Sequence, residues 1–164
     1  MLFRSGSSAS AGGIGFEQWS AWWQARVAAE PVQLLLGQEA FEQVLAEERA
    51  SDRLVCLEVG MTYCRPCKAF EKTYKTVAAE YPGVRFLRIN GNENRSCTVL
   101  ARDVLGIRST PAFYFFRGES ATPVASHTGA NEARLREALD RLLSGGAPSN
   151  GDGGGAAAAA AAAE

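Results

Sequence analysis

The sequence lacks a surplus of either charge and a long apolar run. Its 164 residues carry 17 Lys and Arg against 18 Asp and Glu, a formal net charge of −1. A protein that binds duplex nucleic acid normally carries a basic surplus or stripe, so we expect no nucleic-acid partner. The alanine run at residues 156–163 is far shorter than the ~18–20 apolar residues of a membrane-spanning helix, so we expect no membrane span.

Cysteine and histidine are also scarce. Four cysteines in a chain of this length are too few for a disulfide scaffold. Cys64 and Cys67 form one close pair, but Cys56 and Cys97 do not form a second, and His127 is the only histidine. We therefore expect no metal site and no cofactor, a structural role for His127 and a place in the core for Cys56.

Composition divides the chain into four segments. Residues 1–15 are mostly Ser, Gly and Ala, and residues 144–164 are a Gly/Ala-rich low-complexity tail. Neither segment can bury enough apolar surface to offset the entropy lost on ordering, so both are expected to be flexible. Residues 31–143 carry nearly all the large apolar side chains and are long enough for one domain with its own core. Residues 16–30 lie between the start and this domain.

The first segment bears on localisation. It contains Arg4 and several serines but no acid, which is typical of what remains of an organelle transit peptide. The alternative is an ordinary flexible terminus. The segment lacks the apolar stretch of a secretory signal, so we do not expect export.

Residues 16–30 have the pattern of an amphipathic helix. The large apolar residues fall on one helical face, with one tryptophan beside it: Phe16, Trp19, Trp23 and Val27, with Trp22 alongside. One interpretation is an extra helix packed on the core. The other is a docking helix through which the chain joins a larger protein complex, because aromatic residues dominate interface hot spots.

The core alternates between segments typical of strands and of helices. The predicted strands are residues 32–36, 54–59, 84–89, 112–116 and 124–127. The predicted helices are residues 38–49, 66–81, 97–105 and 131–143, the last with Asn131 as its N-cap. A parallel half followed by a hairpin predicts an α/β fold in three layers, with a mixed sheet between helices.

The chemistry is concentrated at the start of the second core helix. Cys64 and Cys67 are three residues apart, directly after a buried strand, with Pro66 in the first helical turn. The first thiol lies at the helix N-terminus, where free N–H groups stabilise a thiolate. A Cys-x-x-Cys pair after a strand indicates a redox site. One alternative is half of a zinc site, for which the sequence offers no second pair of ligands. The other is a chance pair.

In these features the chain resembles the thioredoxin family over residues 31–143. The resemblance rests on the redox motif at residues 63–68, on Glu58 six residues before the first cysteine, on residues 80–86, on the proline loop at residues 106–111 and on Gly129. It implies a thioredoxin fold and thiol–disulfide oxidoreductase activity. Its partners would be disulfide-containing proteins and a thiol electron donor.

Within the family, the chain is most similar to the atypical chloroplast thioredoxins of plants and green algae. This similarity rests on Trp22 and Trp23 before the domain and on residues 92–97 and 115–118. It implies a chloroplast location, in the stroma or on the stromal face of the thylakoid. A cytoplasmic location is the alternative.

The resemblance also implies roles for the two cysteines and for residues near them. Cys64 would attack the partner's disulfide, and Cys67 would resolve the mixed disulfide. Glu58 would act as the base for Cys67, because an acid in a buried strand should have a raised pKa. The alternative is a structural acid paired with Arg88, and this pairing is compatible with the base role. Pro111 in the cis form would place Thr110 beside the disulfide.

Four further residues complete the expected substrate-binding surface or depart from the family pattern. Tyr63 stands where a tryptophan is usual and Arg65 where a glycine is usual, next to Pro66, while Gly129 ends the last strand. A cation beside Cys64 should stabilise its thiolate and make the couple more oxidising. Cys97, near a helix start, is either a regulatory thiol or an ordinary partly buried residue.

Two functions therefore remain open at this stage. The leading one is a protein thiol–disulfide oxidoreductase. The alternative is a scaffold or assembly subunit of a larger chloroplast complex, with little or no redox turnover.

Overall fold

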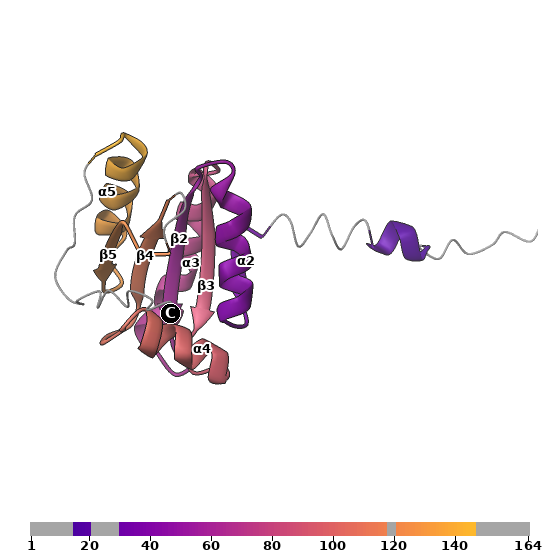
Figure 1. The fold of residues 1–164 in the computed structure, drawn as a ribbon, viewed down its shortest axis with the longest axis horizontal. Coiled ribbons are helices and arrows are strands. Elements are labelled where there is room, and N and C mark those ends of the chain that lie inside the picture. Colours follow the sequence, from indigo (N-terminus) through magenta and orange to yellow (C-terminus); the bar gives the residue numbers. More distant parts are fainter. Residues whose placement is uncertain (1–14, 21–29, 118–120, 147–164) are drawn as a thin grey trace, which may run out of the picture. The chain divides into compact units, whose positions relative to one another are not determined.

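The computed structural model describes residues 15–20, 30–117 and 121–146. From residue 30 onward the described chain forms a central sheet with helices on both faces (Figure 1). In chain order the elements are β1 (Val32–Leu35), α2 (Gln38–Arg49), β2 (Leu54–Gly60), α3 (Arg65–Glu80), β3 (Val84–Asn90), α4 (Arg95–Val99), the π-helix η1 (Leu100–Val104), β4 (Ala112–Phe116), β5 (Ala125–Thr128) and α5 (Glu132–Leu143).

The sheet is mixed, as the order of the predicted elements requires. Its strand order is β1-β3-β2-β4-β5. The strands β1, β3 and β2 are parallel, whereas β4 is antiparallel to β2 and β5 is antiparallel to β4. The fold is therefore the predicted thioredoxin fold, and the predicted strand and helix ends agree with the observed ones to within two residues.

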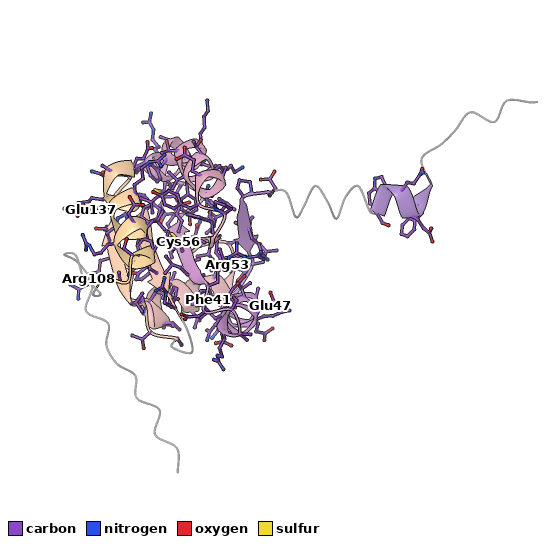
Figure 2. All side chains as sticks on the ribbon, turned by 90° about the horizontal axis from the view of Figure 1, so that it is seen from above. Phe41, Glu47, Arg53, Cys56, Arg108 and Glu137 are labelled. Carbon is purple, nitrogen blue, oxygen red and sulfur yellow. A yellow bond between two sulfur atoms is a disulfide. The ribbon has the colours of Figure 1, made fainter. Side chains whose placement is uncertain are left out.

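The central strand β2 is buried along its whole length, because helices cover both faces of the sheet. One core contains Phe70 and Tyr74 of α3 and Leu139 of α5, and the other contains Phe41 of α2 and Leu100 of η1. In Figure 2, Glu47 of α2 and Glu137 of α5 lie on opposite outer surfaces, with Cys56 of β2 in the interior. Side chains alternate between faces along a strand, so β2 supplies both cores.

The segment after β3 differs from the single helix predicted over residues 97–105. It begins two residues earlier, because the Asn94 side chain accepts a hydrogen bond from the Cys97 backbone N–H at 2.9 Å. It then widens into a π-helix, in which the Leu105 N–H donates to the Leu100 carbonyl at 2.9 Å. Leu100 and Ala101 are fully buried there, and helical spacing alone does not distinguish this wider turn from an α-helix.

The predicted N-terminal helix lies only partly within the described residues. Residues 16–20 are helical and belong to a separate unit, Met1–Glu30. The rings of Phe16 and Trp19 stack with their centroids 6.2 Å apart, and the two side chains are 79% and 48% exposed. Trp22 and Trp23 lie outside the described residues, so the docking role stays a prediction.

A helix that spans a lipid bilayer needs about 20 mostly apolar residues. In residues 15–20, 30–117 and 121–146, no helix is long and apolar enough to cross a membrane.

Candidate active site

The two cysteines of the motif are joined in a disulfide at the start of α3. Their sulfur atoms are 2.08 Å apart and their Cα atoms 5.3 Å apart, which confirms the prediction that they can bridge. Cys64 is the N-cap of α3, and its sulfur accepts a hydrogen bond from the Cys67 N–H at 3.2 Å. An N–H group at a helix start stabilises negative charge, so this position favours a thiolate at Cys64 once the disulfide is reduced.

Exposure distinguishes the two sulfur-bearing side chains. Cys64 is 7% exposed and Cys67 is fully buried, so Cys64 is the more accessible of the pair. This exposed fraction of Cys64 is nevertheless small for a cysteine that attacks a partner's disulfide. The Thr110 side chain covers part of it, with its Oγ1 3.4 Å from the Cys64 sulfur.

The loop before β4 faces the disulfide in the way that the sequence predicts. The Thr110–Pro111 peptide bond is cis, as expected. The Gly129 N–H donates to the Pro111 carbonyl at 2.8 Å, so the turn after β5 is held against this loop. Gly129 has a φ of +96°, a region that favours glycine. The fold thus brings Thr110 to the Cys64 sulfur and joins Gly129 to Pro111, which are far apart in the sequence.

Glu58 lies beneath the cysteine pair, in the middle of β2. Its side chain is fully buried, and burial raises the pKa of its carboxyl group to about 7, against the opposing effect of the Arg88 cation. A Cβ atom added to Gly60 would lie 3.4 Å from the sulfur of Cys67. Residues 58 and 60 share one face of the strand, so the carboxyl group of Glu58 lies on the same side of the sheet as Cys67.

Arg88 links Glu58 to a residue that the sequence analysis missed. Its Nε is 3.9 Å from Glu58 Oε2, and its Nη1 is 3.1 Å from Glu71 Oε2. The expected pairing of Glu58 with Arg88 is thus confirmed, and Glu71 of α3 is added to it. Glu71 follows Cys67 by four residues, which is the spacing of neighbours on one helix face and the one signal that could have found it.

A second residue that was not singled out for a role, Asn92, supports the segment before the motif. Its Oδ1 accepts a hydrogen bond from the Thr62 N–H at 2.8 Å, and its Nδ2 donates to Thr62 Oγ1 at 2.7 Å. The Gly91 N–H donates to the Gly60 carbonyl at 2.8 Å. The loop after β3 therefore fixes the segment that leads into Cys64. This contact follows from the pairing of β3 with β2 in the sheet, and the sequence alone does not reveal it.

The remaining residues of the predicted binding surface lie around Cys64. Tyr63 is 73% exposed, and Arg65 and Pro66 in the first turn of α3 are also exposed. Together they present an aromatic ring and a cation to solvent on one side of the disulfide. Their roles in partner binding stay predictions.

The other cysteines and the histidine lie in the two cores. Cys56 and Cys97 are fully buried, and burial is the largest cause of the raised pKa of each thiol, about 12 for Cys56. The His127 ring stacks on Phe113 with centroids 4.7 Å apart, and burial lowers its pKa to about 4. Among the residues that the structure describes, no three His, Cys, Asp or Glu side chains form a group that could hold a metal ion.

Comparisons with known proteins agree with this geometry. The family model described as Thioredoxin matches residues 32–141. Mouse thioredoxin is 29% identical over 108 residues, which are 66% of this chain and 95% of that protein. Thioredoxin f from spinach chloroplast, in its long form, is 30% identical with a TM-score of 0.61, over 73% of this chain and 93% of that one. A chain in a crystal structure of the ferredoxin:thioredoxin reductase and thioredoxin f2 complex is 25% identical with a TM-score of 0.61, over 68% of this chain and 94% of that one.

Proposed function

Because the chain belongs to the thioredoxin family, we propose that it exchanges disulfides with protein partners through Cys64 and Cys67. The chain is a thiol–disulfide oxidoreductase, and the proposal concerns the residues, partners and place of this activity. The observation that carries it is the Cys64–Cys67 disulfide at the N-terminus of α3. The pair lies where the helix stabilises a thiolate at the more exposed of the two cysteines.

The first step of the proposed cycle takes place at Cys64. In the reduced protein its thiolate attacks one sulfur of the partner's disulfide. A bond forms between that sulfur and Cys64, and the partner's other sulfur leaves as a thiolate that takes a proton from solvent. The product is a mixed disulfide between Cys64 and the partner.

The second step uses Cys67 and Glu58. The Cys67 thiol passes its proton to the Glu58 carboxylate, directly or through solvent, and the resulting thiolate attacks the Cys64 sulfur. The Cys64–Cys67 disulfide forms, and the partner leaves with two reduced sulfurs. A carboxyl group with a pKa of about 7 suits this transfer, because both of its protonation states are populated near neutral pH.

Partner binding is assigned to the surface around Cys64. The loop that holds Thr110 and Pro111, together with Gly129, offers backbone groups with which an extended partner segment can pair. Tyr63, Arg65 and Pro66 are neighbours of Cys64 in the sequence and are exposed. These side chains would determine which partner segments fit.

The relatives suggest where the exchange takes place and what supplies the electrons. Thioredoxin f of spinach is a chloroplast protein, and thioredoxin f2 is found in a complex with ferredoxin:thioredoxin reductase. We assign the chain to the chloroplast, where a reductase or another dithiol would return the Cys64–Cys67 disulfide to two thiols. Its cellular role would be the redox control of proteins in that compartment.

The proposal is tested with a generic protein disulfide and dithiothreitol as the electron donor. The unmodified protein should accelerate reduction of insulin, and Cys64→Ser should abolish the acceleration. With the reductant removed before the partner is added, reduced Cys67→Ser should accumulate the mixed disulfide, whereas Cys64→Ser, which retains only the buried Cys67 of the pair, should not. Absence of turnover and of trapping together would contradict the proposal and favour the scaffold role.

A further inference from the structure

The Arg88 guanidinium lies between two carboxyl groups, one buried and one partly exposed. It makes an ion pair at 3.1 Å with Glu71 of α3, whose side chain is 43% exposed. Its distance to Glu58, which is fully buried, is 3.9 Å. The first distance permits a charge-assisted hydrogen bond and the second does not. No described residue donates a hydrogen bond to either oxygen of Glu58.

This geometry is unusual, because a buried carboxylate is normally paired and hydrogen-bonded. Arg88 is directly opposite Glu58 in the pairing of β2 with β3. A guanidinium carries five N–H groups, so it could serve both carboxylates if its position allowed. It is instead drawn toward α3, and Glu58 is left without a hydrogen bond.

The other ionisable groups near Glu58 are uncharged at neutral pH. On β2 and α3, burial raises the pKa of Cys56 to about 12 and that of Tyr74 well above its usual value. Cys67 is in the disulfide. Phe113 of β4 is paired with Glu58 on one side and with His127 of β5 on the other, and the pKa of His127 is about 4. Among the described residues, Arg88 and Glu71 are the charges that act on Glu58, and Lys75 of α3 pairs with the other oxygen of Glu71 at 3.4 Å.

We propose that Glu71 is a positioning residue, which holds the Arg88 guanidinium at α3 and so prevents it from forming a hydrogen bond with Glu58. The inference rests on the proposed function, since it concerns the group assigned as the base for Cys67. An Arg88 in direct contact would stabilise the Glu58 carboxylate and make it a weaker base. Glu71 keeps the carboxyl group able to take up a proton near neutral pH, and it does so from the protein surface.

The effect is measured on Glu58 itself, in the oxidised protein. The infrared C=O band of its protonated carboxyl group is isolated by subtracting the spectrum of Glu58→Gln, and its intensity is followed against pH. In Glu71→Gln the midpoint should fall by about one pH unit, because an opposite charge in contact lowers a carboxyl pKa by roughly that amount or more. The matched control is Glu80→Gln, which removes an exposed carboxylate of the same helix that pairs with Arg136 and should leave the midpoint unchanged.

Glu71→Gln also removes the repulsion between the Glu71 and Glu58 carboxylates, which by itself would lower the midpoint of the Glu58 titration. The same substitution is therefore repeated in a protein that lacks Arg88. In Arg88→Gln there is no guanidinium to reposition, and the shift caused by Glu71→Gln should fall to less than about half. An equal shift in both backgrounds, no shift, or a shift to higher pH would overturn the inference.

The infrared measurement does not need turnover. An inactive protein would contradict the proposed function and leave this test intact. In an active protein, the rate at which Cys67 resolves the mixed disulfide should rise with pH through the same midpoint. In Glu71→Gln, the pH at which this rate is half-maximal should then move to lower pH by the same amount as the midpoint of the infrared titration.

Discussion

The backbone N–H of Gly129 donates a hydrogen bond to the carbonyl of Pro111, with a nitrogen–oxygen distance of 2.8 Å. This contact joins the turn after β5 to the loop that faces the disulfide. Gly129 has a φ of +96°, a region that an L side chain disfavours. The contact with the cis-proline loop therefore depends on a position at which glycine is favoured.

The first prediction follows from this dependence. Gly129→Ala should lower the free energy of unfolding by about 1–2 kcal/mol, because an L side chain disfavours positive φ. A Cβ atom at this position would meet nothing within 4 Å, so the cost is conformational rather than steric. Urea unfolding of the oxidised protein measures it.

Gly83→Ala is the matched control, since Gly83 also has open space around it and is not at positive φ. It should change the free energy of unfolding by less than about half as much. Equal losses in the two variants would show that the backbone at Gly129 accepts a side chain without strain. Reduction of insulin should suffer more in Gly129→Ala than reduction of a small disulfide, which needs no pairing with the loop.

The second prediction concerns Glu58 and the pH dependence of stability. The carboxyl pKa is about 7 in the folded protein and near 4.5 in the unfolded chain, so the folded state holds more protons between these values. Stability therefore falls as pH rises from about 4.5 to 7, and the loss is complete above 7. Glu58→Gln removes this loss and should stabilise the protein by up to about 3 kcal/mol at pH 8, and by little at pH 4.

Urea unfolding at the two pH values makes the comparison. Glu47→Gln, which changes an exposed carboxylate on α2, should show no such dependence on pH. A Glu58→Gln variant that gains the same stability at pH 4 and pH 8 would mean that the gain does not come from ionisation. The variant should also resolve the mixed disulfide more slowly, because the base is gone.

The third prediction concerns the cation in the motif. Arg65 is exposed beside Cys64, so its effect on the thiolate is screened by solvent and salt. Replacement by Gly or Gln should make the Cys64–Cys67 couple more reducing by tens of millivolts at most, roughly 20 mV. Equilibration with glutathione at low and high salt measures the potential, and the difference should shrink at high salt. A shift in the opposite direction would assign Arg65 to partner recognition instead.

The fourth prediction concerns Cys97. Since its side chain is fully buried and its thiol pKa is raised, a thiol reagent should label neither Cys97 nor Cys56 in the native oxidised protein. In denaturant both free cysteines should react. Cys97→Ser should leave insulin reduction within a few-fold of the original rate. Rapid labelling of Cys97 in the native protein would support a regulatory role for this thiol. Loss of turnover in Cys97→Ser would mean that Cys97 takes part in the redox reaction with Cys64 and Cys67.

Local patterns predicted much of this molecule. Strands such as β2 follow from runs of apolar residues, and the start of α3 follows from Pro66 and the preceding cysteine. The disulfide needed only the spacing of Cys64 and Cys67. Each of these features depends on residues that are close in the sequence, which is why the sequence was sufficient for them.

Features that depend on the crossing of distant elements were not predictable in this way. The contact of Glu71 with Arg88 requires the side chain on α3 to meet one on β3, and no spacing rule connects the two. The contact of the Thr110 side chain with the Cys64 sulfur joins two residues that are 46 positions apart in the sequence. The π-helix depends on how Leu100 and its neighbours pack against the sheet.

The sheet also partitions the four thiols. Cys97 belongs to the core on the α2 side, whereas Cys56 and Cys67 lie on the side of α3. A disulfide requires Cα atoms within about 7 Å, which two residues on opposite faces with helices over them do not reach. Oxidation of the intact protein therefore does not join Cys97 to Cys56 or to Cys67. A molecule that contains either of these bonds has been unfolded at some time, so such chains in a sample record past unfolding.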